Sequence, residues 1–182
     1  RRYDAMVVGP GMGRTPMAKS LFGLLMELIS GLGIGRVLVD GDGLFHAASF
    51  SSGEMLPLSD RIVLTPHFKE ASRLMDEPVD VIKSDRPAAA VRCATRIGAV
   101  VLLKGPASIV TDGTRMIINT TGNPAMATGG AGDVLSGITG AFLARGMKPL
   151  QAAALGAYVH GMAGDIAASV NGIISADRKS VV

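Results

Sequence analysis

The sequence predicts an α/β fold, a three-layer α/β/α domain built around a central, mostly parallel sheet. Short, continuously apolar runs alternate along the chain with longer stretches in which apolar residues recur at helical spacing. Strands that are apolar on both faces and alternate with helices are typical of a parallel sheet covered on both sides. Polar residues and glycines gather directly after several of these runs, as they do at the carboxyl edge of such a sheet.

The first half of the chain contains three of the expected strands. Ala5–Val8 is continuously apolar and closes at a glycine-rich turn, residues 9–13. The helix that follows begins at Pro16, a residue that suits the first helical turn, and stops at residue 29, before Gly31. The remaining elements of this half follow the same alternation: strand 36–39, helix 44–50, strand 62–64 and helix 68–75.

The second half begins with a helix over residues 86–96, and the apolar strand 100–103 then delivers Lys104 to its carboxyl end. Two shorter strands flank the turn at Asp112-Gly113. The remaining expected elements are these: strands 108–111 and 116–119, a helix running on from Asp133, and an Ala- and Gly-rich helix over 150–168. No linker or internal repeat interrupts the pattern, so residues 1–182 are expected to form one domain.

The composition is that of a globular protein. Hydrophobic residues make up 48% and charged residues 18% of the chain, which excludes a disordered polypeptide. The net charge of +3 comes from scattered cations, with two Tyr and no Trp, so the sequence gives weak support to a phosphate-bearing ligand and poor support to nucleic acid. The single Cys93 excludes a disulfide within the chain and is expected to be a small buried residue. With no apolar run long enough for a bilayer and no signal peptide, we expect a cytoplasmic protein without a membrane partner.

The stretch from Thr121 to Asp133 is the centre of the functional prediction. It contains four glycines and two threonines, ends in a single carboxylate and runs directly into an apolar helix. Glycines let backbone N–H groups face a ligand, and a helix N-terminus adds unpaired donors and a positive dipole end. We therefore expect a phosphate over residues 129–132. Asp133 would hold or deprotonate a hydroxyl that takes part in phosphoryl transfer. The alternative is that Asp133 only caps the helix.

Other motifs are weaker. Gly9-Pro-Gly-Met-Gly is similar to a dinucleotide-binding fingerprint, but Arg14 stands where the third glycine belongs. No phosphate-binding loop with the Gly-Lys-Ser/Thr ending occurs, and the three histidines lack metal-ligand spacing, so a zinc site is not expected. Asp40 and Asp42 are either turn residues or a paired acid for magnesium or a ribose. His160 is expected to be a packed core residue, and His67 is left open between function and structure.

Five segments, in this order, resemble the ADP/ATP-dependent NAD(P)H-hydrate dehydratases, a family of the ribokinase-like superfamily: 7–13, 40–44, 64–70, 103–105 and 122–133. The last, Gly-Asn-Pro-Ala-Met-Ala-Thr-Gly-Gly-Ala-Gly-Asp, is the most specific. The chain departs from the family pattern with Asp-Gly-Asp-Gly in place of Asp-Ala-Asp-Ala and with His-Phe-Lys-Glu in place of His-Pro-Gly-Glu. The resemblance also leads us to expect that the family's N-terminal portion is missing.

The resemblance implies a repair reaction. The hydroxyl of the hydrated nicotinamide ring would take a phosphoryl group from ADP or ATP with Mg²⁺, and elimination of phosphate would restore NADH or NADPH. Asp133 would be catalytic and would contact the substrate together with Gly11 and His67. The resemblance assigns the nucleotide to Lys104, Gly105, Pro106, Ala107, Ser108, Gly130 and Gly132. It also implies a homo-oligomer.

Three alternatives use the same residues differently. A ribokinase-like kinase of a vitamin precursor or sugar would leave the phosphate on its product. A non-catalytic module would only bind nucleotide. A Rossmann oxidoreductase would bind NAD at residues 9–13 without any need for ADP or ATP.

Overall fold

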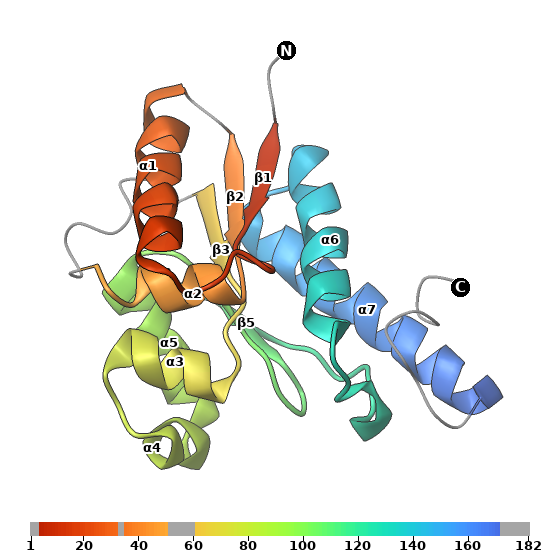
Figure 1. Ribbon diagram of the computed structural model, residues 1–182. Helices are drawn as coiled ribbons and strands as arrows, with labels where there is room; N and C mark the ends of the chain where they lie inside the picture. The colour runs from red at the N-terminus through yellow and green to blue at the C-terminus, as the bar shows by residue number, and fades with distance from the viewer. Residues whose placement is uncertain (1–3, 33–34, 51–60, 172–182) are drawn as a thin grey trace.

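A six-stranded sheet lies between two layers of helices in the computed structural model, which describes residues 4–32, 35–50 and 61–171 (Figure 1). The strands follow one another across the sheet in chain order, β1 to β6. Their bounds are β1 Ala5–Val8, β2 Arg36–Val39, β3 Ile62–Leu64, β4 Val100–Leu103, β5 Ile109–Thr111 and β6 Met116–Ile118. The first four are parallel, whereas β5 and β6 are antiparallel to their neighbours. The predicted mostly parallel sheet is confirmed.

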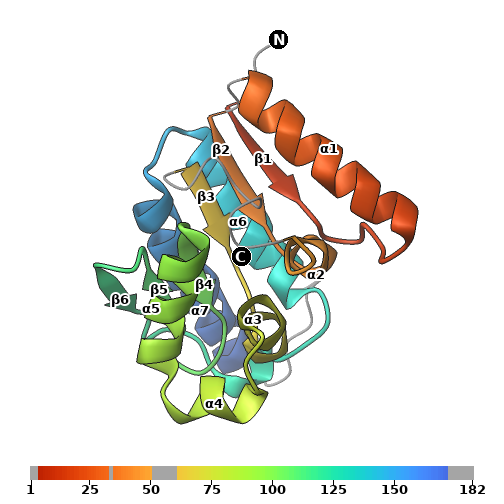
Figure 2. The same ribbon diagram turned by 90° about the vertical axis from the view of Figure 1, so that its left-hand side faces the viewer.

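Helices cover both faces of the sheet, as Figure 2 shows from the side. One layer contains α1 Pro16–Leu32, α2 Asp42–Ala47, α3 Phe68–Met75, α4 Val79–Ser84 and α5 Arg86–Ile97, and the other contains α6 Ala131–Ala144 and α7 Pro149–Asn171. Strand β2 serves both layers, because Val37 and Val39 pack into the core beneath α1 while Leu38 packs against α6 and α7. All three side chains are fully buried, and each such burial is worth roughly 1.5–3 kcal/mol.

The predicted elements are present, with small differences in their ends. Helix α2 begins at Asp42, two residues before the expected start, because a carboxylate in the first turn suits a helix N-terminus. Helix α4 was not predicted, since six residues after Pro78 are too few to show a helical period. The 3₁₀ helix η2, Pro124–Met126, was also missed. Within the described residues no helix has the length and apolar character needed to cross a membrane. A single domain over 1–182 stays a prediction.

The structure agrees with the predicted position of Cys93. This side chain is 1% exposed in the core between α5 and the sheet. Burial disfavours the thiolate and raises the pKa of Cys93 to about 12. The thiol is therefore a packing group in the folded protein.

Candidate functional site

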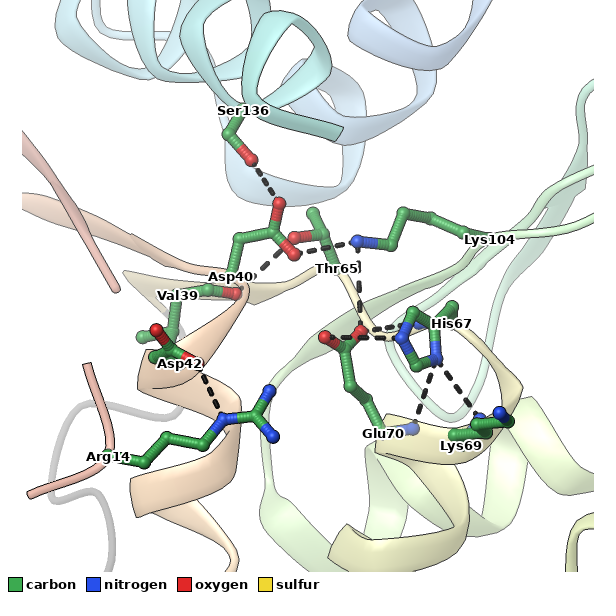
Figure 3. A network of polar contacts seen from close by, with 10 residues as sticks. All are labelled: Arg14, Val39, Asp40, Asp42, Thr65, His67, Lys69, Glu70, Lys104 and Ser136. Atoms are coloured by element: carbon green, nitrogen blue, oxygen red, sulfur yellow. Dashed lines mark hydrogen bonds and ion pairs between the residues drawn. The ribbon is translucent and has the colours of Figure 1, made fainter. Parts of the chain in front are cut away.

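The loops that follow the parallel strands meet at one edge of the sheet, and the N-terminus of α6 lies beside them (Figure 3). Asp40 follows β2, Thr65 follows β3 and Lys104 follows β4. Backbone hydrogen bonds extend the pairing past the strand ends, since Asp40 N donates to Val8 O at 3.1 Å and Lys104 N to Pro66 O at 2.8 Å. The loops are therefore held in a fixed relation, as the sequence predicts for the carboxyl edge of such a sheet.

Helix α6 begins without a side-chain cap. Its N-cap residue is Gly130, which has φ 79°, a left-handed conformation that a residue with a Cβ rarely adopts. No side chain accepts a hydrogen bond from the first turn. The Ala131 N–H donates to the Thr128 carbonyl at 3.3 Å, which leaves the N–H groups of the next residues for an anion. Asp133 is the third residue of the helix and is exposed, and its side chain makes no hydrogen bond or ion pair within the described chain. The alternative that Asp133 only caps α6 is therefore wrong.

Asp40 is buried directly beneath this helix end. Its Oδ1 accepts a hydrogen bond from Lys104 Nζ at 2.7 Å, and its Oδ2 accepts one from Ser136 Oγ at 2.7 Å. Its side chain is 3% exposed and that of Lys104 is 20% exposed. A Cβ added to Gly132 would lie 3.5 Å from Asp40 Oδ2 and 3.6 Å from Lys104 Nζ. The ammonium group therefore lies next to the predicted phosphate site.

His67 and Glu70 form a capping box at the start of α3. His67 Nδ1 accepts hydrogen bonds from the backbone N–H groups of Lys69 and Glu70, and Glu70 Oε2 accepts one from the His67 N–H at 2.8 Å. Glu70 Oε2 is also 3.8 Å from Lys104 Nζ. The other ring nitrogen, His67 Nε2, is 3.5 Å from Glu70 Oε1, and the ring is half exposed. His67 thus has a structural role as the cap of α3, and half of its side chain stays exposed.

A side chain of helix α5 holds the loop that follows Lys104. Arg86 donates to the carbonyl of Ala107 at 2.8 Å, and Ala107 has φ 48°. Ser108 Oγ donates to the carbonyl of Gly105 at 3.1 Å, which closes the turn. Pro106 and Ala107 are exposed. The predicted nucleotide segment is therefore an ordered, outward-facing turn that starts at the Asp40–Lys104 ion pair.

The glycine turn after β1 is tied to α2. Asp42 accepts hydrogen bonds from Gly13 N at 3.0 Å and from Arg14 Nε at 2.7 Å, and His46 Nε2 is 2.8 Å from the Gly13 carbonyl. The hydrogen bond from Arg14 holds the pKa of Asp42 below its ordinary value. Gly11, the predicted substrate contact, is exposed at the tip of this turn.

Asp40 and Asp42 do not form a paired acid site. Figure 3 shows the Asp42 carboxylate directed to Arg14 and the Asp40 carboxylate directed to Ser136 and Lys104. Gly41, between them, has φ 54°, and this turn separates the two side chains. The interpretation that they jointly hold magnesium or a ribose is therefore wrong. The Rossmann alternative also fails, because β1 to β4 follow one another in chain order, without the reversal of strand order at which that fold binds a dinucleotide.

Asp165 of α7 holds the beginning of the glycine-rich loop. It accepts hydrogen bonds from Gly122 N and from Asn123 Nδ2, each at 2.8 Å. The Gly122 hydrogen bond is the main reason that the pKa of Asp165 is below its ordinary value. Three residues of the site were not predicted from the sequence: Asp165, Ser136 and Glu70. A signal existed for Glu70 alone, since its place three residues after His67 is that of a capping-box partner.

No group of three or more His, Cys, Asp or Glu side chains suited to a metal ion occurs among the described residues. His160, expected to be a core residue, is 9% exposed.

Comparisons with known proteins agree with this geometry. A protein-family model described as NAD(P)H-hydrate dehydratase matches residues 1–181. The chain is 42% identical over 174 residues to the bifunctional NAD(P)H-hydrate repair enzyme of Moorella thermoacetica, and the match covers 93% of the chain and 31% of the relative. It is 35% identical over 172 residues to the ADP-dependent (S)-NAD(P)H-hydrate dehydratase of Neisseria meningitidis, covering 93% of the chain and 57% of the relative.

The fold also has solved neighbours. The chain is similar to a ribokinase-like superfamily protein of Enterococcus faecalis, with a TM-score of 0.82 and 28% identity over 98% of this chain and 60% of the other. The predicted ribokinase-like fold is confirmed. The chain spans about a third of the bifunctional relative and somewhat more than half of the dehydratase from Neisseria.

Proposed function

Because the chain belongs to the NAD(P)H-hydrate dehydratase family, we propose that it converts hydrated NADH or NADPH back to the reduced cofactor. The ring hydroxyl of the substrate attacks the terminal phosphorus of ADP or ATP. An oxygen–phosphorus bond forms, and the bond from that phosphorus to the bridging oxygen of the nucleotide breaks. The ring then loses inorganic phosphate and a proton, which regenerates the dihydronicotinamide. The ADP-dependent dehydratase of Neisseria supports ADP as the donor.

One observation supports this proposal above the others. Helix α6 has an uncapped N-terminus at Gly130, and its third residue, Asp133, is an exposed carboxylate without a partner in the described chain. A helix start of this kind stabilises a phosphate through its N–H groups and dipole. A carboxylate on the same turn is placed to accept the proton of a hydroxyl near that phosphate. Catalysis of phosphoryl transfer depends mainly on positioning the reacting groups and on stabilising the charge of the phosphate.

We assign Asp133 to the catalytic role and to substrate contact. Its exposed carboxylate would orient the ring hydroxyl and receive its proton as the hydroxyl attacks phosphorus. Gly130 and Gly132 would present backbone N–H groups to the transferred phosphate, because neither carries a side chain that would cover them. Gly11 and His67 would contact the hydrated dinucleotide from the neighbouring loops.

Lys104 and the turn that follows it would bind the nucleotide donor. Lys104 shares its charge with the buried Asp40, and its ammonium lies beside Gly132, so it adds positive potential where the phosphates would bind. The turn contributes outward-facing backbone groups and the Ser108 hydroxyl. The residues proposed for the donor remain Lys104, Gly105, Pro106, Ala107, Ser108, Gly130 and Gly132.

The residues present fit a magnesium ion that arrives with the nucleotide, not one held in a cage of protein ligands. The described chain has no cluster of three metal-binding side chains, and Asp133 is a single exposed carboxylate at the phosphate site. Magnesium in proteins is commonly bound by one or two carboxylates together with substrate phosphates. When bound, it would neutralise charge on the phosphate oxygens.

The test mixes the purified chain with hydrated NADH, ADP or ATP, and magnesium, and follows the absorbance of reduced nicotinamide. We expect a nucleotide-dependent rise in absorbance. Asp133→Asn should reduce the rate by about 10²–10⁴-fold, the usual contribution of a positioned proton acceptor, with little change in nucleotide affinity. Arg145→Gln, exposed at the C-terminal end of α6, is the control and should retain the wild-type rate.

The alternatives give different results in the same experiment. A ribokinase-like kinase would release no inorganic phosphate and would accumulate a phosphorylated product. A non-catalytic module would bind ADP without turnover in either the wild type or Asp133→Asn. A wild-type rate that Asp133→Asn leaves unchanged would refute the role proposed for this carboxylate.

We also propose that the chain forms a homo-oligomer. Exposed apolar side chains recur at helical spacing along α7, at Tyr158, Met162, Ile166 and Val170. A contiguous apolar stripe on a folded protein is typical of an interaction surface. Light scattering coupled to gel filtration should give a mass that is a multiple of 18.7 kDa, and Met162→Lys should shift it towards the monomer.

A further inference from the structure

A cavity lies at the edge of the sheet where the parallel strands begin, opposite the edge that carries Asp40 and Lys104. Its volume is about 1,010 Å³. It is lined at the start of β2 by Arg36, just before β3 by Arg61, just before β4 by Ala99, and at the start of α7 by Lys148 and Pro149. This is the edge at which the chain enters β1 in Figure 1. We call it the amino-edge cavity, and it shares no residue with the site around Asp133.

The amino-edge cavity is strongly basic. Among the described residues that line it, four side chains are cations, Arg36, Arg61, Arg115 and Lys148, and one is a carboxylate, Asp112. The fold thus brings four cations from distant positions of the sequence to one concave surface.

The carboxylate in the cavity is already neutralised. Asp112 accepts hydrogen bonds from Arg115 Nε at 2.9 Å and Nη2 at 2.6 Å, and further ones from the backbone of residues 114 and 115. These bonds hold the pKa of Asp112 below its ordinary value. The side chains of Arg36 and Lys148 make no hydrogen bond or ion pair within the part of the chain that the structure describes. Their charges are available to a ligand.

The shape and lining of the cavity indicate the kind of ligand. Its volume is far larger than one phosphate requires and is close to the upper limit of ordinary small-molecule sites. Its other walls include the small or apolar residues Ala94, Ala99 and Leu150, and among the described residues no aromatic ring lines it to stack on a base. Arginine binds phosphate through two parallel N–H groups, and the start of the 23-residue helix α7 adds the positive end of its dipole.

We propose that the amino-edge cavity binds a small anion with two or more phosphate charges, separately from the nucleotide at α6. Arg36 and Lys148 bind the phosphate groups, and the apolar wall contacts the body of the ligand. The cavity is connected to the active-site edge by short strands. Arg36 opens β2, which leads to Asp40, and Val100 opens β4, which leads to Lys104. The bound anion thus lies one strand length from the Asp40–Lys104 pair.

The test uses inorganic pyrophosphate as the probe and nitrogen–proton correlation NMR of the whole chain as the readout. We expect saturable shifts of the amide signals of Gly98 and Gly113, which line the cavity. Arg36→Gln combined with Lys148→Gln should weaken this binding by about tenfold or more, since each lost charge-assisted hydrogen bond is worth a factor of that size. The unshifted remainder of the spectrum reports that the variant is folded.

A matched control removes two charges elsewhere. Lys19→Gln combined with Arg145→Gln changes the net charge equally but touches no residue of the cavity. It should leave the affinity at Gly98 and Gly113 within about twofold, as expected for screened surface charges. Equal weakening by both double variants, or saturable shifts confined to Gly130 and Gly132, would overturn the proposal. Because the experiment measures binding through the amide signals of Gly98 and Gly113, its result does not depend on whether the chain dehydrates hydrated NADH.

Discussion

The Asp40–Lys104 ion pair should contribute measurably to folding as well as to the site. Asp40→Asn keeps the size of the side chain and an oxygen that can accept from Ser136 Oγ. It removes the charge that compensates the ammonium of Lys104. Breaking a buried pair from one side commonly costs about 3–5 kcal/mol, because the other charge stays buried.

Two features of the structure make the expected loss of stability smaller than this. The Lys104 side chain is 20% exposed, so water partly solvates its charge, and Glu70 Oε2 is 3.8 Å from its Nζ. We therefore expect Asp40→Asn to lower the free energy of unfolding by about 2–3 kcal/mol. Urea denaturation followed by far-ultraviolet circular dichroism measures it, a signal that suits a chain without tryptophan.

A double-mutant cycle separates the pair from other effects. Lys104→Met removes the ammonium, and the double variant should be less destabilised than the sum of the singles by about 1 kcal/mol or more. The exposed pair Arg92–Glu77 supplies the control, since Glu77→Gln should cost no more than about 1 kcal/mol. If the effects of Asp40→Asn and Lys104→Met add within about 0.5 kcal/mol, the coupling inferred from the 2.7 Å contact is refuted.

Three further predictions concern other parts of the chain. Gly140→Ala should lower the free energy of unfolding by about 1–3 kcal/mol, because its Cβ would lie 2.5 Å from Val7 Cγ2; thermal denaturation measures this, and an unchanged melting temperature contradicts the packing. Cys93 should react with a thiol reagent in urea and not in buffer, because it is 1% exposed and its pKa is raised to about 12; fast labelling of the native chain contradicts this. The pKa of Asp165 is lowered in the folded chain, so its contribution to stability is present above its ordinary value of 3.8 and is lost as the pH falls through the lower folded value. Asp165→Asn should therefore make the free energy of unfolding fall less steeply as the pH is lowered into the acid range. An unchanged pH dependence would contradict the stabilisation of the Asp165 carboxylate by the Gly122 hydrogen bond.

The sequence predicted the sheet well because its strands are local signals. Residues 62–64 and 100–103 are continuously apolar and end in recognisable turn or polar residues, so neither needs distant information to be identified. The glycine-rich start of α6 was predicted for the same reason. Short elements such as α4 were missed, since six residues do not display a helical period.

The polar network of the site could not be predicted in this way. Ser136 lies 96 residues from its partner Asp40, and 64 residues separate Asp40 from Lys104. Nothing in a single sequence indicates such pairs, because they depend on how α6 packs on the finished sheet. The error about Asp42 has a local cause, since the positive φ of Gly41 turns two nearby carboxylates to different partners.

The way in which Ser136 and Lys104 share one buried carboxylate also limits how this sequence can diverge. Replacing Asp40 by a residue without a side-chain oxygen leaves Ser136 Oγ without its acceptor and leaves Lys104 with only the more distant Glu70 carboxylate. A change at Ser136 leaves only one oxygen of Asp40 without its donor. Substitution should therefore be tolerated first at Ser136. Asp40 and Lys104 should be exchanged together or not at all, and a library that randomises the three positions at once should recover folded variants that single-site libraries do not contain.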